Sequence, residues 1–302
     1  MKLAYVPAPE AAAAHGGADP WLELDPGACA EAIGRRELAV RHNLADDPLL
    51  CLEAIADLAD SLPSRAVERH QARQPLLVPG GCPDLAGPAS ETVHTIGTNG
   101  CWMVLWNIEQ SPRYRRLLDA ILDEAAPLLP AREGGMGRRE AFLFLSTPLA
   151  VTPVHFDPEH NFLLQIRGSK EVQVGRFPDR AWERRELDRY HDGGHRNLVE
   201  VPPRSSAFQM LPGDGVYLYP WVPHWVLNGP AVSISLSITF RTRRSERVEH
   251  VHLLNGRLRR HGLSPRPAGE SELVDRLKAA LASFVSWLLR GCRPQRGARD
   301  YG

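Results

Sequence analysis

The segment 231–240 constrains the fold more than any other part of this 302-residue chain. Apolar residues occupy every second position from Val232 to Phe240, and serine or threonine fills each position between them, from Ser233 to Thr239. Successive side chains of a β-strand point to opposite faces of its sheet. The segment is therefore predicted to be a strand with one face in an apolar core and the other lined by small hydroxyl groups.

Further short apolar runs come before this strand and are separated by turn signals rich in proline and glycine. Many short strands with such turns indicate an antiparallel barrel or sandwich, and a polar inner face would leave its interior open to water. We therefore expect a mainly β fold with flanking helices. The predicted strands lie at 141–145, 161–166, 170–174, 207–211, 216–219 and 231–240.

Helices are expected on both sides of these strands. Residues 1–90 have apolar residues at helical spacing, interrupted by prolines and glycines, and an amphipathic helix is predicted at 112–129. Another helix is expected to begin near Glu270, with a broad apolar stripe from Leu273 to Leu288 that could pack on the core or serve as a dimer surface. The expected organisation is a helical and loop region at 1–90, a β-barrel catalytic domain at 91–245, and a C-terminal helical extension at 246–302 as a possible dimerisation element.

The composition excludes several classes of protein. The 36 basic residues are balanced by 36 acidic residues, which argues against nucleic acid as the main partner. The five cysteines are odd in number and far apart, with no CxxC pair, as is typical of a reducing compartment. Prolines and a glutamate interrupt the alanine-rich start of the chain, so it does not read as a secretion signal. We expect a cytoplasmic protein that binds neither nucleic acid nor membranes.

Two separated segments carry residues suited to binding one metal ion. His155 and Asp157 are two positions apart in an extended segment, so both side chains point to one face. His224 follows a Pro-Gly-Asp turn and a short strand, and it could supply a third ligand. Each of these residues alone is more often structural, but their order along the chain favours a shared site. Two histidines and a carboxylate on one side of a metal form the facial triad of non-haem Fe(II) enzymes.

These segments resemble the two cupin motifs, with Gly168 at the expected glycine and Asn161 where many cupins have a glutamate ligand. A neutral amide there leaves three coordination positions free, which a bidentate 2-oxo acid and dioxygen require. The run from Thr152 to Lys170 resembles the JmjC branch of the 2-oxoglutarate oxygenases, and particularly the asparaginyl hydroxylase that inhibits hypoxia-inducible factor. The resemblance covers about residues 141–240 and implies a double-stranded β-helix, the jelly-roll barrel of cupins and JmjC proteins.

The resemblance also implies roles for single residues. For Lys170 the residues themselves agree, because an ammonium group that points into a barrel needs an anion to offset its burial. The alternative is a lysine at a solvated strand end. An aromatic segment at 102–109 could form a wall of the pocket. The implied iron ligands and catalytic centre are His155, Asp157 and His224; the implied 2-oxoglutarate-binding residues are Thr152 and Lys170 at its distal carboxylate, with Asn161 and Thr239 beside it.

The resemblance implies an Fe(II)- and 2-oxoglutarate-dependent oxygenase that uses O2 to hydroxylate a C–H bond. The expected substrate is an amino-acid side chain of a protein or peptide, with a small molecule or a peptide natural product as the alternative. Two other classes stay open: a cupin metalloenzyme that does not use 2-oxoglutarate, favoured if Lys170 faces solvent, and a non-catalytic cupin-like regulator, disfavoured by the complete set of ligands. We expect a homodimer.

Overall fold

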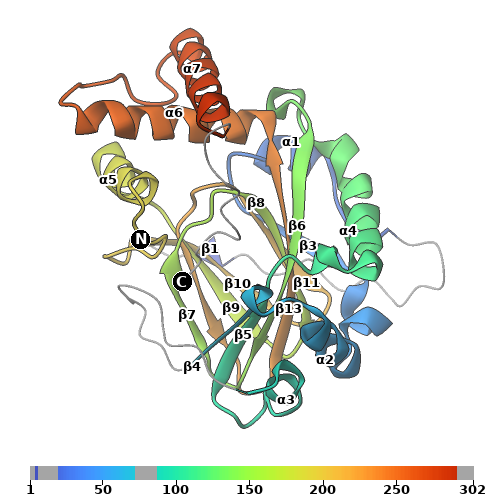
Figure 1. Ribbon diagram of the computed structural model, residues 1–302. Coiled ribbons are helices and arrows are strands. Elements are labelled where there is room, and N and C mark those ends of the chain that lie inside the picture. The colour runs from blue at the N-terminus through green and yellow to red at the C-terminus, as the bar shows by residue number, and fades with distance from the viewer. Residues whose placement is uncertain (1–3, 6–19, 72–86, 291–302) are drawn as a thin grey trace.

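Two β-sheets with helices around them make up the computed structural model, which describes residues 4–5, 20–71 and 87–290 (Figure 1). One sheet has the strand order β1-β10-β9-β12-β7, and the other has the order β2-β3-β11-β8-β13-β6-β5-β4. The strands of the first are β1 (Ala4–Tyr5), β7 (Val151–His155), β9 (Lys170–Gly175), β10 (Arg204–Met210) and β12 (His224–Asn228). Those of the second are β2 (Leu22–Glu23), β3 (Leu38–His42), β4 (Val67–Gln71), β5 (Cys101–Leu105), β6 (Met136–Ser146), β8 (His160–Arg167), β11 (Asp214–Leu218) and β13 (Ser233–Thr242).

The chain passes repeatedly from one sheet to the other between β6 and β13. Strands β7, β9, β10 and β12 belong to the first sheet, while β6, β8, β11 and β13 belong to the second. All the pairings among these eight strands are antiparallel. This crossing pattern gives the double-stranded β-helix, so the predicted jelly-roll fold is confirmed.

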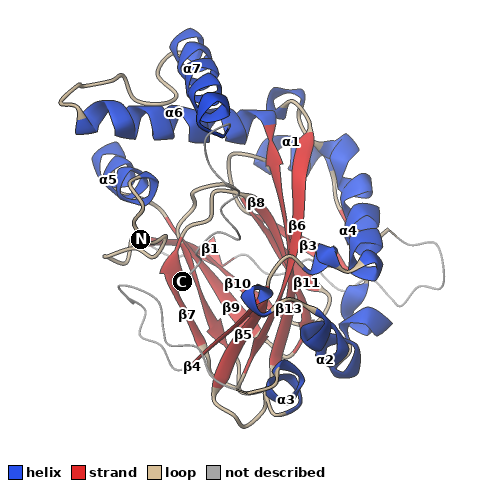
Figure 2. Ribbon diagram, viewed as in Figure 1, coloured by secondary structure: helices blue, strands red, loops and turns tan. Residues whose placement is uncertain are grey.

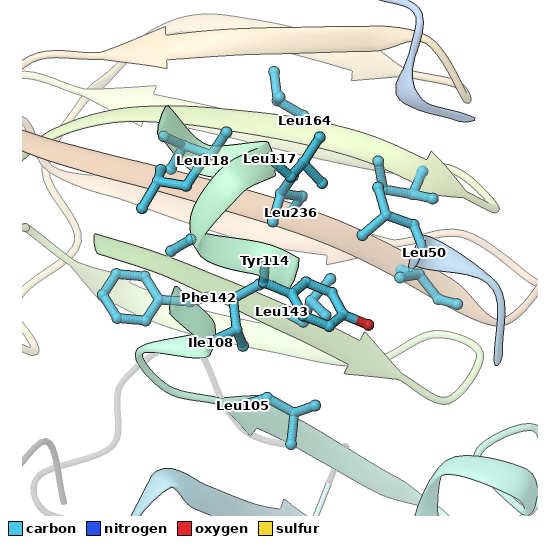
Figure 3. Close-up of a cluster of buried hydrophobic side chains, with 14 of the residues drawn as sticks. Leu50, Leu105, Ile108, Tyr114, Leu117, Leu118, Phe142, Leu143, Leu164 and Leu236 are labelled. Atoms are coloured by element: carbon cyan, nitrogen blue, oxygen red, sulfur yellow. The ribbon is translucent and has the colours of Figure 1, made fainter. Parts of the chain in front are cut away.

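Strand β13 has the two unlike faces that its sequence predicts. Ile234, Leu236, Ile238 and Phe240 are buried in the main apolar cluster, which Figure 3 shows in part. Fully burying one such aliphatic side chain contributes roughly 1.5–3 kcal/mol, so this face is a large part of what holds the sheet against its helices. The opposite face carries the hydroxyl groups and is turned towards the first sheet.

Helix α4 (Pro112–Ala125) covers the outer face of the second sheet (Figure 2). Its buried stripe includes Leu117 and Leu118, which belong to the same cluster as Leu236. The helix starts at a proline, whose missing N–H is not needed in the first turn. It ends four residues before the predicted end at 129, because Pro127 cannot donate a helical hydrogen bond, and a 3₁₀ turn, Ala126–Leu128, follows.

Among the described residues of the N-terminal region there are four strands, β1 to β4, besides the helices that were expected there. Strand β3 pairs with β11, and β4 pairs with β5, so both extend the second sheet. These strands are at most five residues long and lack a clear alternation, which is why hydrophobic periodicity does not reveal them. The division of the chain into three segments stays a prediction. The helices of this region are α1 (Pro26–Ala32), α2 (Leu52–Ser61) and α3 (Ala89–His94).

Three helices lie towards the C-terminal part of the chain, and Figure 1 shows them together at one end of the barrel. They are α5 (Arg180–His191), α6 (Arg243–Arg260) and α7 (Glu272–Arg290). Helix α7 packs on α6 and buries Ala279 and Ala282. The side chains of Phe284, Val285 and Leu288, part of the predicted stripe, lie outside the described residues. Within the described part of the chain, no helix is both long and apolar enough to span a bilayer.

Gly168 allows a close approach of two backbones at the turn between β8 and β9. Its φ is +72°, and a Cβ atom there would lie 2.2 Å from the carbonyl oxygen of Val232. Gly262, after α6, has a similar φ of +76° but open space around it. A Gly262→Ala change should cost about 1–2 kcal/mol from backbone strain alone. Gly168→Ala should cost distinctly more, because Val232 must also move. Urea unfolding of both variants tests this, and equal losses would contradict the steric role of Gly168.

Candidate metal and cofactor site

Three side chains converge at the end of the first sheet. His155 ends β7 and His224 begins β12, and the two residues are directly opposite in the ladder between these strands. Asp157 follows two residues after His155, and its Oδ2 lies 3.8 Å from Nε2 of His155 and 3.5 Å from Nε2 of His224. The ligand atoms of all three residues lie within 4.8 Å of one another. The structure therefore brings together the three residues proposed from the sequence.

Both imidazoles present a free lone pair to the same point. Nδ1 of His155 lies 2.8 Å from the carbonyl oxygen of Pro153, and Nδ1 of His224 lies 3.0 Å from that of Val222. A carbonyl oxygen only accepts hydrogen bonds, so each Nδ1 carries the proton and each Nε2 is free to bind a metal. Burial lowers the pKa of both histidines below its usual range. They are therefore neutral ligands at physiological pH.

Asp157 supplies the negative charge of the group. Burial by itself would raise its pKa, but the positive charge of Arg196 and the two nearby imidazoles outweigh burial and lower the pKa to about 2. Nη1 of Arg196 donates a hydrogen bond to Oδ1 of Asp157, while Oδ2 faces the imidazoles. Two neutral nitrogens and one carboxylate oxygen are a donor set that suits Fe(II) and similar divalent ions.

The three residues line a pocket between the two sheets. It encloses about 700 Å³, including space that is open to solvent. Part of the lining is aromatic, and other parts carry polar groups. The aromatic wall consists of Trp102, Trp106, Phe142 and Phe144, and the polar lining includes Thr152, Asn161, Lys170, Ser237 and Thr239. All seven residues proposed from the sequence thus lie in one pocket.

Lys170 is buried without a compensating charge. Only 5% of its surface is exposed, and its amine makes no hydrogen bond or ion pair with any residue that the structure describes. Burial lowers the pKa of this lysine to about 7. Lys170 is four residues from Val174 on β9, and Val174 is opposite His224. At 3.3 Å per residue, the backbone positions of Lys170 and Val174 are about 13 Å apart. A dicarboxylate together with the lysine side chain can bridge this span.

Thr239 adds a second polar group that has no partner. Its Oγ1 is buried and forms no hydrogen bond within the described part of the chain. Thr239 is opposite Asn161 in the β13–β8 ladder, and Oδ1 of Asn161 accepts a hydrogen bond of 2.8 Å from Ser237. Thr152 is half-buried and opposite Val226. Unpaired polar groups deep in a protein are costly, so Lys170 and Thr239 together fit an anionic ligand in the pocket.

Sequence patterns did not indicate every residue of this pocket. Arg196 lies in the polar loop after α5, a helix without an apolar stripe, and no motif includes it. Glu159, beside the ligands, is buried against Arg241 at 2.5 Å, a contact that no local pattern predicts. Phe142 and Phe144 alternate along β6 and could have been assigned to the inner face by that period.

Part of the chain matches a known protein family. The sequence model of the JmjC domain family matches residues 140–248 of this chain. This range contains all seven residues proposed for the site. Residues 140–248 are thus similar to JmjC domains. The JmjC resemblance of the sequence is thereby confirmed, whereas the particular likeness to an asparaginyl hydroxylase stays a prediction. No protein among the curated sequences matches the chain.

Solved structures agree about the fold around the JmjC domain. The X-ray structure of Escherichia coli YcfD is 18% identical and has a TM-score of 0.52, covering 88% of this chain and 68% of that chain. A second structure of the Escherichia coli protein is described as the ribosomal oxygenase YcfD in complex with cobalt and 2-oxoglutarate. It is 15% identical and has a TM-score of 0.53, covering 89% of this chain and 68% of that chain. At these identities the likeness concerns the fold.

Removing a ligand of the JmjC domain should abolish metal binding. We expect His155→Ala and Asp157→Ala to lose the binding of Co(II), because the two remaining ligands bind the ion too weakly to compete with its hydration by water. A His94→Ala variant is the matched control, since His94 is exposed on α3. Titration with Co(II), followed by its visible absorption, measures the affinity. Unchanged affinity in the His155 and Asp157 variants would refute the ligand assignment.

Proposed function

We propose that this protein is an Fe(II)- and 2-oxoglutarate-dependent oxygenase that hydroxylates a C–H bond in an amino-acid side chain of a protein or peptide. One observation carries the choice of cosubstrate: Lys170 is buried in the same pocket as the triad and has no counter-ion among the described residues. A dicarboxylate that reaches the metal position with one end would place its other carboxylate near this amine.

The burial of Lys170 also bears on the competing classes. A cupin metalloenzyme that does not use 2-oxoglutarate has no need for an unpaired ammonium group inside its barrel, where desolvation costs several kcal/mol. That class would be favoured by a lysine in solvent, but 95% of the surface of Lys170 is covered, since its exposure is 5%. A non-catalytic regulator, in turn, does not need three ligands with the correct free lone pairs. The arrangement favours the oxygenase.

The chemistry divides between the cofactors and the chain. Iron(II), when bound with 2-oxoglutarate and O2, supplies the oxidising power that converts C–H to C–OH while 2-oxoglutarate becomes succinate and CO2. His155, Asp157 and His224 would hold the ion at the pocket that they line. Lys170, with Thr152, Asn161 and Thr239 near it, orients the cosubstrate. The aromatic wall excludes water and positions the substrate.

A protein or peptide substrate is favoured by two observations. The pocket opens to solvent and has an aromatic wall, which suits a side chain presented from a larger molecule. The fold is similar to that of YcfD, which is described as a ribosomal oxygenase. A small molecule or a peptide natural product is the alternative. We also propose a cytoplasmic location, supported by the free thiols of Cys29, Cys51 and Cys101; Cys82 and Cys292 lie outside the described residues.

A second copy of the chain is the proposed partner of helix α7. Leu273, Leu277 and Leu281 follow one another at intervals of four residues and are 70%, 64% and 52% exposed. We expect that Leu277→Glu combined with Leu281→Glu gives a monomer, because the dimer would bury two charges in its interface. Arg276→Glu is the control: Arg276 is also exposed on α7, and this variant should remain a dimer. Light scattering after size-exclusion chromatography measures the mass. A wild-type monomer would refute the dimer.

The oxygenase proposal is tested by adding Fe(II) and 2-oxoglutarate to the protein without oxygen. We expect the weak visible absorption band that iron and a 2-oxo acid produce together, followed by succinate formation when air and substrate are admitted. The test does not require the substrate for its first step. Absence of the band at saturating Fe(II) and 2-oxoglutarate would exclude this reaction class.

The same titration tests Lys170 through its pH dependence. The pKa of the buried amine is about 7 without ligand, and a bound dicarboxylate raises it. Affinity for 2-oxoglutarate is therefore fully present below pH 7 and should fall by up to about tenfold per pH unit above it. Lys170→Arg stays charged and should show a flat profile between pH 7 and 9. Lys170→Met should bind weakly throughout. A wild-type profile that does not fall above pH 7 would remove the anchoring role of Lys170.

A further inference from the structure

We infer that Arg196 is a positioning residue that turns the Asp157 carboxylate so that only one of its oxygens reaches the metal, an inference that rests on the proposed metal site. The guanidinium of Arg196 donates a hydrogen bond to Oδ1. The other oxygen, Oδ2, is the one that lies 3.5 Å and 3.8 Å from the two imidazole Nε2 atoms. The two oxygens of one carboxylate are therefore divided between a guanidinium and the ligand cluster.

Hydrogen bonds hold the backbone on both sides of Arg196. Arg189 of α5 donates through Nη1 to the carbonyl oxygen of His195 at 2.7 Å and through Nη2 to that of Asn197 at 2.5 Å. Glu186, which is buried, holds the guanidinium of Arg189 with contacts of 3.1 Å and 2.8 Å. Helix α5 thus fixes the residues directly before and after Arg196.

The same loop is joined to the strand that carries the first ligand. Asn197 forms an antiparallel bridge with His155, and the N–H of Leu198 donates to the carbonyl oxygen of Val154 at 2.9 Å. Strand β7 and the loop of Arg196 are therefore bonded side by side. The position of Arg196 relative to His155 and Asp157 is set by backbone hydrogen bonds, which permit little displacement.

The guanidinium of Arg196 also lies over an aromatic ring. The central carbon of the Arg196 guanidinium lies 5.9 Å from the ring centre of Trp106. The indole N–H of Trp106 donates to Glu68 at 2.6 Å, so this ring is itself held in place. Only 16% of the Arg196 side chain is exposed. The guanidinium thus interacts with both a ring face and a carboxylate, a combination that a lysine cannot reproduce.

This arrangement has a consequence for coordination. A carboxylate can bind a metal through one oxygen or through both, and binding through both would occupy one of the positions that the cosubstrate and O2 need. A charge-assisted hydrogen bond to Oδ1 commits that oxygen to Arg196. Arg196 therefore keeps Asp157 a ligand through Oδ2 alone. Partners of this kind typically change metal affinity by 10- to 100-fold.

The test compares metal binding in Arg196→Met, Arg196→Lys and a control variant. Co(II) is the probe, and its visible absorption reports both affinity and coordination without any turnover. Arg196→Met should weaken Co(II) binding by about 10- to 100-fold and change the shape of the spectrum. Arg196→Lys should lose less affinity, because it keeps the charge but not the planar fork. Arg176→Met is the control, since Arg176 is 49% exposed, pairs with Glu37 and does not line the pocket.

The outcomes separate this inference from the proposed function. Wild-type protein that does not bind Co(II) would overturn the metal site, and with it the role of Arg196. Wild-type binding with unchanged affinity and spectrum in Arg196→Met would overturn the role of Arg196 alone. Circular dichroism of the metal-free variants establishes that each is folded. If Arg196→Met does not fold, Arg196→Lys decides by the same measurement, and wild-type values for affinity and spectrum in that variant overturn the inference.

Discussion

The pairing of β12 between β7 and β9 is the interaction on which the site depends. Its hydrogen bonds place His224 opposite His155 on one side and opposite Val174 on the other, so that one inner face carries both histidines and, farther along, Lys170. The period of two in each strand fixes which side chains share that face, and a shift of one residue would turn them outward. The metal position and the proposed anchor are therefore set by one ladder.

The charges in the pocket are arranged unevenly. Asp157 has Arg196 beside it and keeps a pKa of about 2, whereas Lys170 has no anionic neighbour among the described residues and its pKa falls to about 7. The ionised carboxylate of Asp157 can bind a cation, and the amine of Lys170 lacks an anionic partner among the described residues. A molecule that chelates the metal at one end and carries a carboxylate at the other compensates the second of these deficits.

The sequence predicts the parts of this structure that depend on local pattern. The alternation in β13 predicts its two faces, and the spacing of His155 and Asp157 predicts a chelating pair, because both follow from strand geometry alone. Arg196 and the pairing of β3 and β4 with the second sheet could not be predicted in this way. They depend on contacts between segments that are distant along the chain, such as Arg189 binding the loop or β3 meeting β11.

Arg196 reaches the site from the connection between β9 and β10, which contains α5 and is not one of the eight strands of the jelly roll. This excursion is thus outside the jelly roll, although backbone hydrogen bonds join it to β7. Substitutions in the excursion that displace Arg196 change the hydrogen bonding of Asp157 while the three ligands themselves stay the same. Diversification of chemistry among barrels of this type would then be sought in an appendage of the scaffold instead of in its ligating residues.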